Sequence, residues 1–205
     1  MTSPTSLSPA DLKTAQRREV MAHRRGVHAL RQVEGAQNLA ANVAVEIPAA
    51  GNIIAGYWPL GDEIDCRPAL GALKLAAAQV ALPVAAGQGQ VLLFRSWCPG
   101  DELQPGPFGT AHPTPRAGVI VPNILLLPLI AFDATGHRLG YGAGYYDRTV
   151  ADLRQDRAIV VVGIAYDEQE VEAVPADRHD QRMDAVITDR RTLIFTEAFR
   201  ALKTR

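Results

Sequence analysis

The stretch from Ile124 to Arg148 (I-L-L-L-P-L-I-A-F-D-A-T-G-H-R-L-G-Y-G-A-G-Y-Y-D-R) constrains the fold more than any other part of the chain. Its first part is an almost unbroken apolar run with one proline, a pattern typical of a strand buried on both faces. Residues 133 to 136 contain the Asp, Thr and Gly of a turn, and three glycines alternate within residues 140 to 144. The sequence therefore predicts a strand, a glycine-rich loop and then a helix beginning near Tyr145.

This succession of elements is suited to binding phosphate. Gly140, Gly142 and Gly144 leave the backbone N–H groups accessible to an anion, and the first turn of a helix offers unpaired donors at its positive end. Arg138 and Arg148 add positive charge on either side. Three glycines within a few residues are also compatible with nothing more than a tight loop.

Two well-known nucleotide motifs do not fit. A Walker loop requires Gly-Lys-Ser/Thr, and the chain has no lysine between Lys74 and Lys203. A dinucleotide fingerprint requires a third glycine where Tyr145 stands, and a tyrosine there blocks close packing of helix on strand. Asp167, after the next apolar run, imitates the ribose-binding acid of that fingerprint, so a nicotinamide-dependent oxidoreductase is a weak alternative.

A long helix with a basic stripe is expected near the N-terminus. Residues 1 to 8 are predicted to be a disordered leader, Ser8 can cap a helix, and Pro9 can open it; the helix should run to about residue 32. At about 100° per residue, four basic side chains fall on one stripe, namely Lys13, Arg17, Arg24 and Arg31. The stripe is either a solvated face or a surface for an anion, because aligned like charges repel each other.

An acidic loop follows the first predicted strand, residues 52 to 57. Asp62, Glu63 and Asp65 lie where an open α/β sheet places ligand contacts, although they would also stabilise the N-terminus of a helix over residues 68 to 79. Trp58, at the strand end, is either a wall for a flat ring or a core residue.

The remaining pattern alternates strands with helices. Strands are predicted at residues 80–84, 91–97 and 158–166, and helices at 37–45 and 145–153. The Pro- and Gly-rich segment 98–118 cannot form regular structure for long. The expected fold is a single three-layer α/β domain over residues 9–205, with a mostly parallel or mixed central sheet and an N-terminal helix.

Composition limits the classes of partner. The chain has 205 residues, 47% hydrophobic and 21% charged, with a net charge of −1, so a small-molecule ligand is expected and nucleic acid is not. No apolar run approaches about 20 residues, which argues against a membrane span. We expect a cytoplasmic protein, a monomer or weak homodimer, whose Cys66 and Cys98 are reduced packing residues.

Two motifs resemble the signature of the 5-formyltetrahydrofolate cyclo-ligase family. One is F-D-x-x-G-x-R-L-G-x-G-x-G-Y-Y-D-R at residues 132–148, and the other is P-x-x-x-x-D-x-x-x-D-x-V-x-T at residues 175–188. The resemblance implies a Rossmann-like architecture. It also implies conversion of 5-formyltetrahydrofolate to 5,10-methenyltetrahydrofolate with ATP and Mg²⁺, releasing ADP and phosphate.

The resemblance also implies site residues. ATP would contact Lys13, Arg17, Arg24, Arg138, Leu139, Gly140, Gly142, Gly144, Tyr145 and Tyr146. The folate substrate would contact Trp58, Glu63, Phe108, Tyr141 and Tyr145. Arg138, Tyr145 and Asp147 are the expected catalytic residues, and Asp147 and Asp180 the expected Mg²⁺ ligands, since hard oxygen donors suit this metal.

Two features leave alternatives open. His112 stands where the family has an acidic residue, so a non-catalytic or differently specific nucleotide- or pteridine-binding relative is the alternative function. A histidine beside proline in a loop is more often exposed than functional. Asp180 could also pair with Arg178 or Arg182 rather than with a metal.

Overall fold

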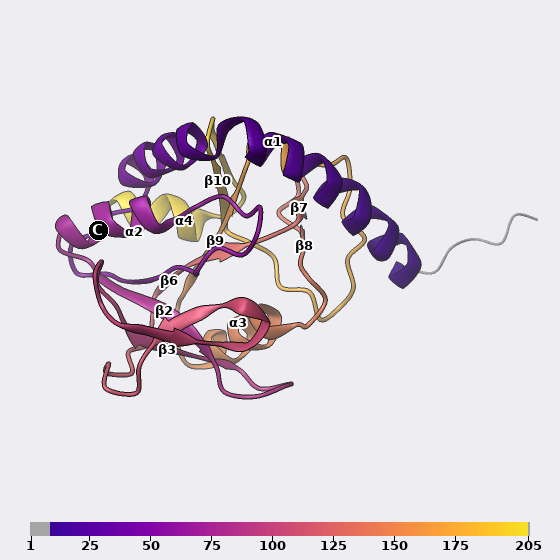
Figure 1. The fold of residues 1–205 in the computed structure, drawn as a ribbon. Helices are drawn as coiled ribbons and strands as arrows, with labels where there is room; N and C mark the ends of the chain where they lie inside the picture. The colour runs from indigo at the N-terminus through magenta and orange to yellow at the C-terminus, as the bar shows by residue number, and fades with distance from the viewer. Residues whose placement is uncertain (1–8, 205) are drawn as a thin grey trace, which may run out of the picture.

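A seven-stranded sheet forms the centre of the computed structural model, which describes residues 9–204 (Figure 1). Its strand order is β11-β10-β9-β6-β1-β2-β3, in which the five inner strands run parallel and the two edge strands run antiparallel to their neighbours. The strands are β1 (Ile53–Ala55), β2 (Gln79–Ala85), β3 (Leu92–Ser96), β6 (Ile124–Pro128), β9 (Val160–Ala165), β10 (Ala185–Thr188) and β11 (Thr192–Ile194).

Helices cover both faces of this sheet. Figure 1 shows α1 (Pro9–Glu46), α2 (Arg67–Leu75) and α4 (Glu197–Arg200) above the sheet and α3 (Tyr145–Asp156) below it. Two separate apolar clusters correspond to the two faces of the sheet. One joins α1, α2 and α4 to one face, and the other joins α3 to the opposite face. The predicted three-layer α/β fold with a mixed, mostly parallel sheet is therefore confirmed.

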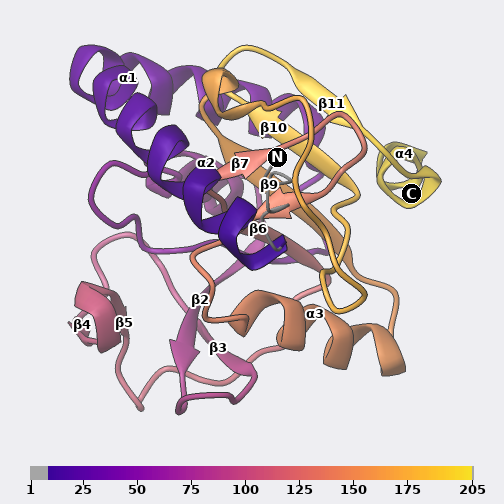
Figure 2. The same ribbon diagram turned by 90° about the vertical axis from the view of Figure 1, so that its right-hand side faces the viewer.

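Short elements complete the chain. A β-hairpin of β4 (Leu103–Pro105) and β5 (Ala111–Pro113) encloses a 3-10 turn at Pro107–Gly109, and Figure 2 shows it beside β2 and β3. Further 3-10 turns lie at Asp167–Gln169 and Ala201–Thr204. The predicted leader, residues 1–8, lies outside the described residues. Over residues 9–204, no helix has both the length and the apolar character needed to cross a membrane.

The N-terminal helix is longer than predicted. Two helices, ending near residue 32 and beginning near residue 37, were expected, but α1 continues from Pro9 to Glu46 with one non-helical residue, Arg31 (φ −147°, ψ 32°). The guanidinium of Arg31 donates to Asp189 at 2.8 Å and also pairs with Glu168. These carboxylates come from distant parts of the chain. α1 consists of two helical segments that meet at a kink at Arg31, so the predicted break near residue 32 is present as a kink without an intervening loop.

The apolar stretch after Ile124 is not one strand. β6 ends at Pro128, and the chain then forms a second hairpin from β7 (Ala131–Phe132) and β8 (Arg138–Leu139) before it reaches the glycine loop. The turn of this hairpin is built on Asp133, whose Oδ1 accepts from the N–H groups of Thr135 and His137. The predicted turn is confirmed, and the hairpin carries Arg138 toward the start of α3.

The chain order of the parallel strands places a crevice between β1 and β6. From β1 the chain moves to β2 on one side, and it later returns to β6, β9 and β10 on the other. In sheets of this kind the loops at the carboxyl ends diverge at such a switch point and leave room for a ligand. Tyr57 and Trp58 follow β1, and Pro128 ends β6.

Candidate active site

A cavity of about 540 Å³ lies at this switch point. Its walls come from the start of α1, the acidic loop after β1, the β2–β3 edge, the glycine loop with the start of α3, and the loop before β10. Most of the site residues expected from the resemblance line it: Lys13, Arg17, Trp58, Glu63, Arg138, Leu139, Gly140, Tyr141, Gly142, Gly144, Tyr145, Tyr146, Asp147 and Asp180.

The glycine loop requires two of its glycines. Gly142 (φ 96°) and Gly144 (φ 68°) adopt the left-handed conformation that side chains disfavour, and Gly144 is the residue immediately before α3. A Cβ at Gly144 would lie 2.7 Å from Nη1 of Arg148. The loop is held to α1, because Nε of Arg17 donates to the carbonyl oxygen of Gly140 at 2.8 Å. The first turn of α3 therefore opens onto the cavity beside a fixed cation.

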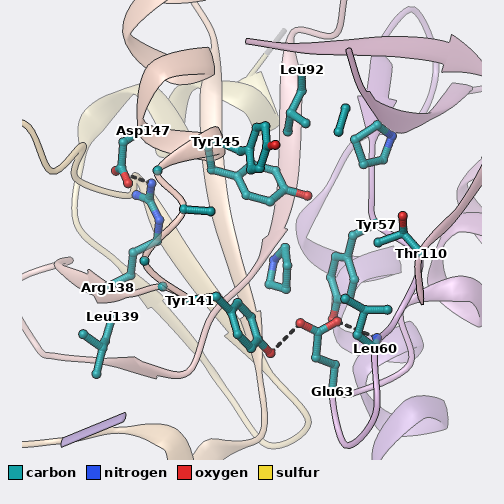
Figure 3. A pocket seen from close by; sticks show the side chains of 18 of the residues that line it. Tyr57, Leu60, Glu63, Leu92, Thr110, Arg138, Leu139, Tyr141, Tyr145 and Asp147 are labelled. Atoms are coloured by element: carbon teal, nitrogen blue, oxygen red, sulfur yellow. Dashed lines mark hydrogen bonds and ion pairs between the residues drawn. The ribbon is translucent and has the colours of Figure 1, made fainter. Parts of the chain in front are cut away.

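Arg138 and Asp147 form an ion pair in the cavity wall, with Nη2 of Arg138 2.5 Å from Oδ1 of Asp147 (Figure 3). The same carboxylate oxygen accepts from the N–H of Gln181 at 3.0 Å, and Arg138 also donates to the carbonyl of Gln181. Burial lowers the pKa of Arg138, and the charge of Asp147 opposes that effect. This pair joins the hairpin, α3 and the loop before β10.

A second ion pair lies in the same cavity. Nζ of Lys13 is 2.7 Å from Asp180 and 3.1 Å from Asp177. Burial opposes the charged form of Lys13, but its hydrogen bonds to the carboxylates of Asp180 and Asp177 outweigh that effect and raise the pKa of the lysine. The alternative that Asp180 pairs with Arg178 or Arg182 is wrong, and the solvated-face account of the basic stripe fails at this residue.

The opposite side of the cavity is aromatic and acidic. Figure 3 shows Glu63, Leu60 and Tyr57 facing Arg138 and Asp147 across the pocket, with Tyr141 extending from the glycine loop toward Glu63. The hydroxyl of Tyr141 donates to Oε1 of Glu63 at 2.6 Å. Burial raises the pKa of Glu63, partly offset by the bonds from Tyr141 and the Leu60 N–H.

Trp58 lies between the core and the cavity, and both predicted roles apply to it in part. It is half-buried, lines the cavity, and packs edge-on against Trp97 with ring centroids 6.5 Å apart. The guanidinium of Arg67 lies 4.7 Å from the Trp58 ring centroid. A flat apolar surface held in this way can stack against a planar ligand.

Arg24 departs from the expected phosphate-binding position. The residue is 2% exposed, and its nitrogens donate to Asp62 (2.7 Å), to the hydroxyl of Tyr141 (3.0 Å) and to the carbonyl of Leu129 (3.2 Å). Among the described residues that line the cavity, Arg24 is absent. The structure therefore places it behind Tyr141, where it supports the wall.

The hairpin β4–β5 contributes less than expected. His112 is buried in β5, contacts the carbonyl of Pro113 through Nδ1 (3.2 Å), and is not among the described lining residues, whereas Thr110 and Ala111 are. The expectation of an exposed histidine is wrong, and its imidazole does not stand in the pocket in place of an acid. The side chain of Phe108 lies outside the described part of the structure.

Several residues that line the cavity were not predicted from the sequence, among them Tyr57, Leu60 and Asp177. Tyr57 lines the pocket and donates its hydroxyl to the carbonyl of Ile64 at 2.7 Å, and Asp177 and Leu60 also face the cavity. Asp177 lies inside the recognised motif at residues 175–188 and could have been found from its position three residues before Asp180. Leu60 acts through a backbone N–H, for which a sequence gives no signal.

Two carboxylates of the cavity suit a metal ion that takes only one or two ligands from the protein. Within residues 9–204 no three His, Cys, Asp or Glu side chains gather as a complete metal site. Asp147 and Asp180, however, both line the cavity. Mg²⁺ commonly takes one or two carboxylates and completes its shell with phosphates and water, so this donor set suits it. Asp167 pairs with Arg191 at 2.7 Å and is not a described lining residue, which removes the support for a dinucleotide site.

Comparison with known proteins identifies the family. The model of the 5-formyltetrahydrofolate cyclo-ligase family matches residues 10–189. The chain belongs to this family. A 5-formyltetrahydrofolate cyclo-ligase of Haemophilus influenzae is 32% identical over 171 residues, covering 80% of this chain and 90% of that protein. The Escherichia coli K12 cyclo-ligase is 31% identical over 178 residues, covering 82% and 96%.

A solved structure agrees with the family assignment. The 5,10-methenyltetrahydrofolate synthetase of Aquifex aeolicus superposes with a TM-score of 0.70 at 26% identity, covering 90% of this chain and 93% of that one. The Mycoplasma pneumoniae synthetase, at 24% identity and a TM-score of 0.67, shares the fold. The family resemblance of the two sequence motifs is thus confirmed. Membership in this family indicates an enzyme of the ligase class.

Proposed function

We propose that this cyclo-ligase family member converts 5-formyltetrahydrofolate to 5,10-methenyltetrahydrofolate with consumption of ATP and release of ADP and phosphate. One observation carries the proposal: a single cavity has cations and the N-terminus of α3 at one side, and an aromatic wall with a buried carboxylate at the other. The first side suits phosphates and the second suits a pterin, so both substrates can meet in one space.

At the phosphate side, the chain supplies positive charge and donors. Lys13, Arg17 and Arg138 line the cavity near the glycine loop, and the first N–H groups of α3 have no partner within the helix. Phosphoryl transfer demands little covalent chemistry from a protein and much charge compensation around the transferring oxygens. We assign these groups to holding the nucleotide and to stabilising the charge that develops as the formyl oxygen takes the phosphoryl group.

Asp147 and Asp180 would hold the magnesium ion. When bound, the ion would supply charge compensation at the phosphate oxygens. Asp147 is also held in place by Arg138 and by the Gln181 N–H, so the protein itself fixes the position of its carboxylate. Lys13 is paired with Asp180, and both line the cavity, so binding of the nucleotide would let the lysine exchange this carboxylate for a phosphate.

At the pterin side, the chain orients the second substrate. Glu63 presents carboxylate oxygens that can accept from the donor edge of a pterin ring, and Trp58 and Tyr57 offer flat surfaces. Correct placement of the formyl group relative to the phosphates is then the main contribution to rate, since holding two reactants together replaces an encounter in solution.

The decisive experiment is spectroscopic. Purified protein is mixed with 5-formyltetrahydrofolate and MgATP, and formation of methenyltetrahydrofolate is followed by its near-ultraviolet absorbance, with omission of ATP as the control. We expect absorbance to grow only in the complete mixture, with one ADP released per product. Binding of both ligands without absorbance growth would support the non-catalytic relative instead.

A further inference from the structure

Glu63 is a buried carboxylate with a donor on each oxygen. Glu63 is only 4% exposed, yet it lines the cavity. Oε2 accepts from the N–H of Leu60 at 2.8 Å, and Oε1 accepts from the hydroxyl of Tyr141 at 2.6 Å. Burial of a carboxylate is costly without such bonds, so both donors stabilise it in this position.

The direction of the bond from Tyr141 is fixed by Arg24. Nη1 of Arg24 lies 3.0 Å from the Tyr141 hydroxyl oxygen, and a guanidinium can only donate. The hydroxyl oxygen must therefore accept from Arg24, which leaves its own proton for Glu63. The guanidinium carbon also lies 5.8 Å from the ring centroid of Tyr141, so the arginine contacts both the ring and its hydroxyl.

Arg24 is itself anchored by a carboxylate. Its Nη2 donates to Oδ1 of Asp62 at 2.7 Å, in a pair whose arginine side chain is 1% exposed. The chain of contacts Asp62–Arg24–Tyr141–Glu63 thus connects α1, the acidic loop and the glycine loop. Tyr141 stands between Gly140 and Gly142, so it is the one member of this chain of contacts that belongs to the phosphate side of the cavity.

We propose that Tyr141 is a positioning residue for the folate substrate: its hydroxyl, oriented by Arg24, holds the Glu63 carboxylate ionised and directed at the donor edge of the pterin. The proposal rests on the proposed function for the identity of the ligand. It assigns the tyrosine a role through Glu63. Residue 141 falls at one of the variable positions of the glycine motif, G-x-G-x-G. The proposed role therefore depends on the presence of a tyrosine at this position of the sequence.

The surroundings of Glu63 show why the hydroxyl matters. Burial raises the pKa of Glu63, the bonds from Tyr141 and Leu60 and the charge of Arg24 lower it, and Asp62 raises it further. The other groups that interact with Glu63 carry no charge at neutral pH, since burial raises the pKa of each of them; they are Tyr57, Cys66 and Tyr146. Loss of the Tyr141 hydroxyl therefore moves the protonation of Glu63 to higher pH.

The test is Tyr141→Phe, which keeps the ring and removes the hydroxyl. Using product formation across a pH series, we expect KM for 5-formyltetrahydrofolate to rise about tenfold or more, because a hydrogen bond to a charged group is lost. KM for ATP should change less than about twofold, on the same scale of energies. The acid limb of kcat/KM for the folate should move to higher pH. An unchanged folate KM and an unchanged acid limb would overturn the proposal.

A second measurement does not depend on activity. The Glu63 carboxyl carbon, labelled with ¹³C and assigned with Glu63→Gln, is titrated by NMR in wild type and in Tyr141→Phe. We expect a higher pKa in the variant, and equal values would refute the ionising role even if the protein proves to be no cyclo-ligase. Failure of wild type to form product with this pKa difference present would count against the proposed function alone.

Asp62→Asn serves if Tyr141→Phe does not fold. This variant leaves Tyr141 and Glu63 in place and weakens the anchor of Arg24, so the folate KM should rise in the same direction by a smaller factor. Folate KM is the deciding readout for this variant, because loss of the Asp62 charge by itself lowers the pKa of Glu63. A normal folate KM in folded Asp62→Asn would then overturn the proposed chain of contacts.

Discussion

Nζ of Lys13 lies 2.7 Å from Oδ2 of Asp180, although the two residues are 167 positions apart in the chain. This contact joins the start of α1 to the loop before β10 inside the wall of the cavity. A second cation, Arg138, is paired with Asp147 in the same wall. Two cations of the cavity wall are therefore each paired with a carboxylate of the same wall. Under the proposed function, binding of a magnesium nucleotide would exchange partners at both pairs.

The first prediction concerns Arg17, whose Nε holds the glycine loop through Gly140. Arg17→Ala should raise KM for ATP about ten- to hundredfold, because charge-assisted bonds contribute about 1.5–3 kcal/mol each. KM for 5-formyltetrahydrofolate should stay within about threefold, since this side chain lies with the glycine loop and not with Glu63. Steady-state kinetics with either substrate varied gives both values.

The matched control for Arg17 is its neighbour. Arg18→Ala removes an exposed arginine of the same helix that is not a described lining residue of the cavity. Equal effects of the two substitutions would mean that general charge on α1, and not the Arg17 contact, attracts the nucleotide.

The second prediction concerns Glu63. Glu63→Gln should raise KM for the folate about tenfold or more and leave ATP binding intact, because a neutral amide accepts less strongly from the pterin and presents a donor where an acceptor is needed. Asp65→Asn, in the same loop but paired with Arg67, is the control. Isothermal titration with each ligand separates the two effects, and a weaker ATP affinity in Glu63→Gln would contradict the assignment.

The pH dependence of folate binding follows from the same residue. Burial raises the pKa of Glu63 above its ordinary value of 4.5. The carboxylate is the form that accepts hydrogen bonds, so folate affinity should be present above this raised pKa and fall as the pH drops through it. In Glu63→Gln this acid limb should vanish, whereas its persistence there would point to another titrating group.

That the glycine loop, Arg138 and Asp147 lie together could be predicted, because they belong to one continuous motif in the sequence. Its glycines and charged side chains are residue types suited to binding an anion or a cation. The pairs Lys13–Asp180 and Tyr141–Glu63 could not, since each joins segments that only the completed sheet brings together. The burial of Arg24 could not be predicted either. The helical periodicity shows which side chains share a face of the helix, but it does not show which of them are buried by other elements of the fold.

The layers of the fold could be predicted from the order and apolar character of the expected elements. Alternating strands and helices with long apolar runs allow few arrangements other than a covered parallel sheet. The kink at Arg31 and the extra hairpin β7–β8 could not be predicted. Arg31 makes its ion pairs with Glu168 and Asp189 from distant segments, and the turn of the hairpin is closed by hydrogen bonds to Asp133.

The third prediction concerns stability and rests on Asp133. Burial would raise its pKa, but hydrogen bonds from Thr135, Val174 and His137 outweigh that effect and lower it below 3.8. Asp133→Asn should cost about 2 kcal/mol of unfolding free energy, because the amide nitrogen would face the Val174 N–H, a donor against a donor. Urea denaturation at neutral pH measures the loss, with Asp156→Asn at the exposed end of α3 as the control.

The same residue gives the sign of an acid effect. Between the lowered folded pKa and the ordinary value of 3.8 the unfolded chain binds more protons, so stability rises with pH in that window. The contribution of Asp133 is fully present above pH 3.8 and is lost as pH falls through the folded pKa. Wild type should therefore lose more stability on acidification than Asp133→Asn does, and parallel acid curves for the two proteins would contradict this role.

The last prediction concerns Asp147, for which two roles differ in outcome. If its carboxylate serves mainly as a partner for Arg138 and for the start of α3, Asp147→Asn should reduce stability and leave turnover nearly intact. If it holds magnesium, the fold should survive while kcat falls about ten- to hundredfold, as is usual when the support of a metal is weakened. We expect the second outcome, because Asp147 lines the cavity and its carboxylate is fixed by Arg138 and Gln181.

Magnesium titration separates these roles. If Asp147 holds the metal, activity of Asp147→Asn should recover in part at high Mg²⁺, since the lost carboxylate weakens metal capture while Lys13 and Arg17 still line the cavity. Mn²⁺ binding in the presence of ATP, measured by electron paramagnetic resonance, gives a readout that does not depend on turnover. Asp152→Asn, exposed on the same helix, controls for the general loss of negative charge. Normal turnover of Asp147→Asn at low Mg²⁺ would remove the metal assignment and leave Asp147 as the structural partner of Arg138, with the phosphate side of the cavity formed by cations and backbone donors alone.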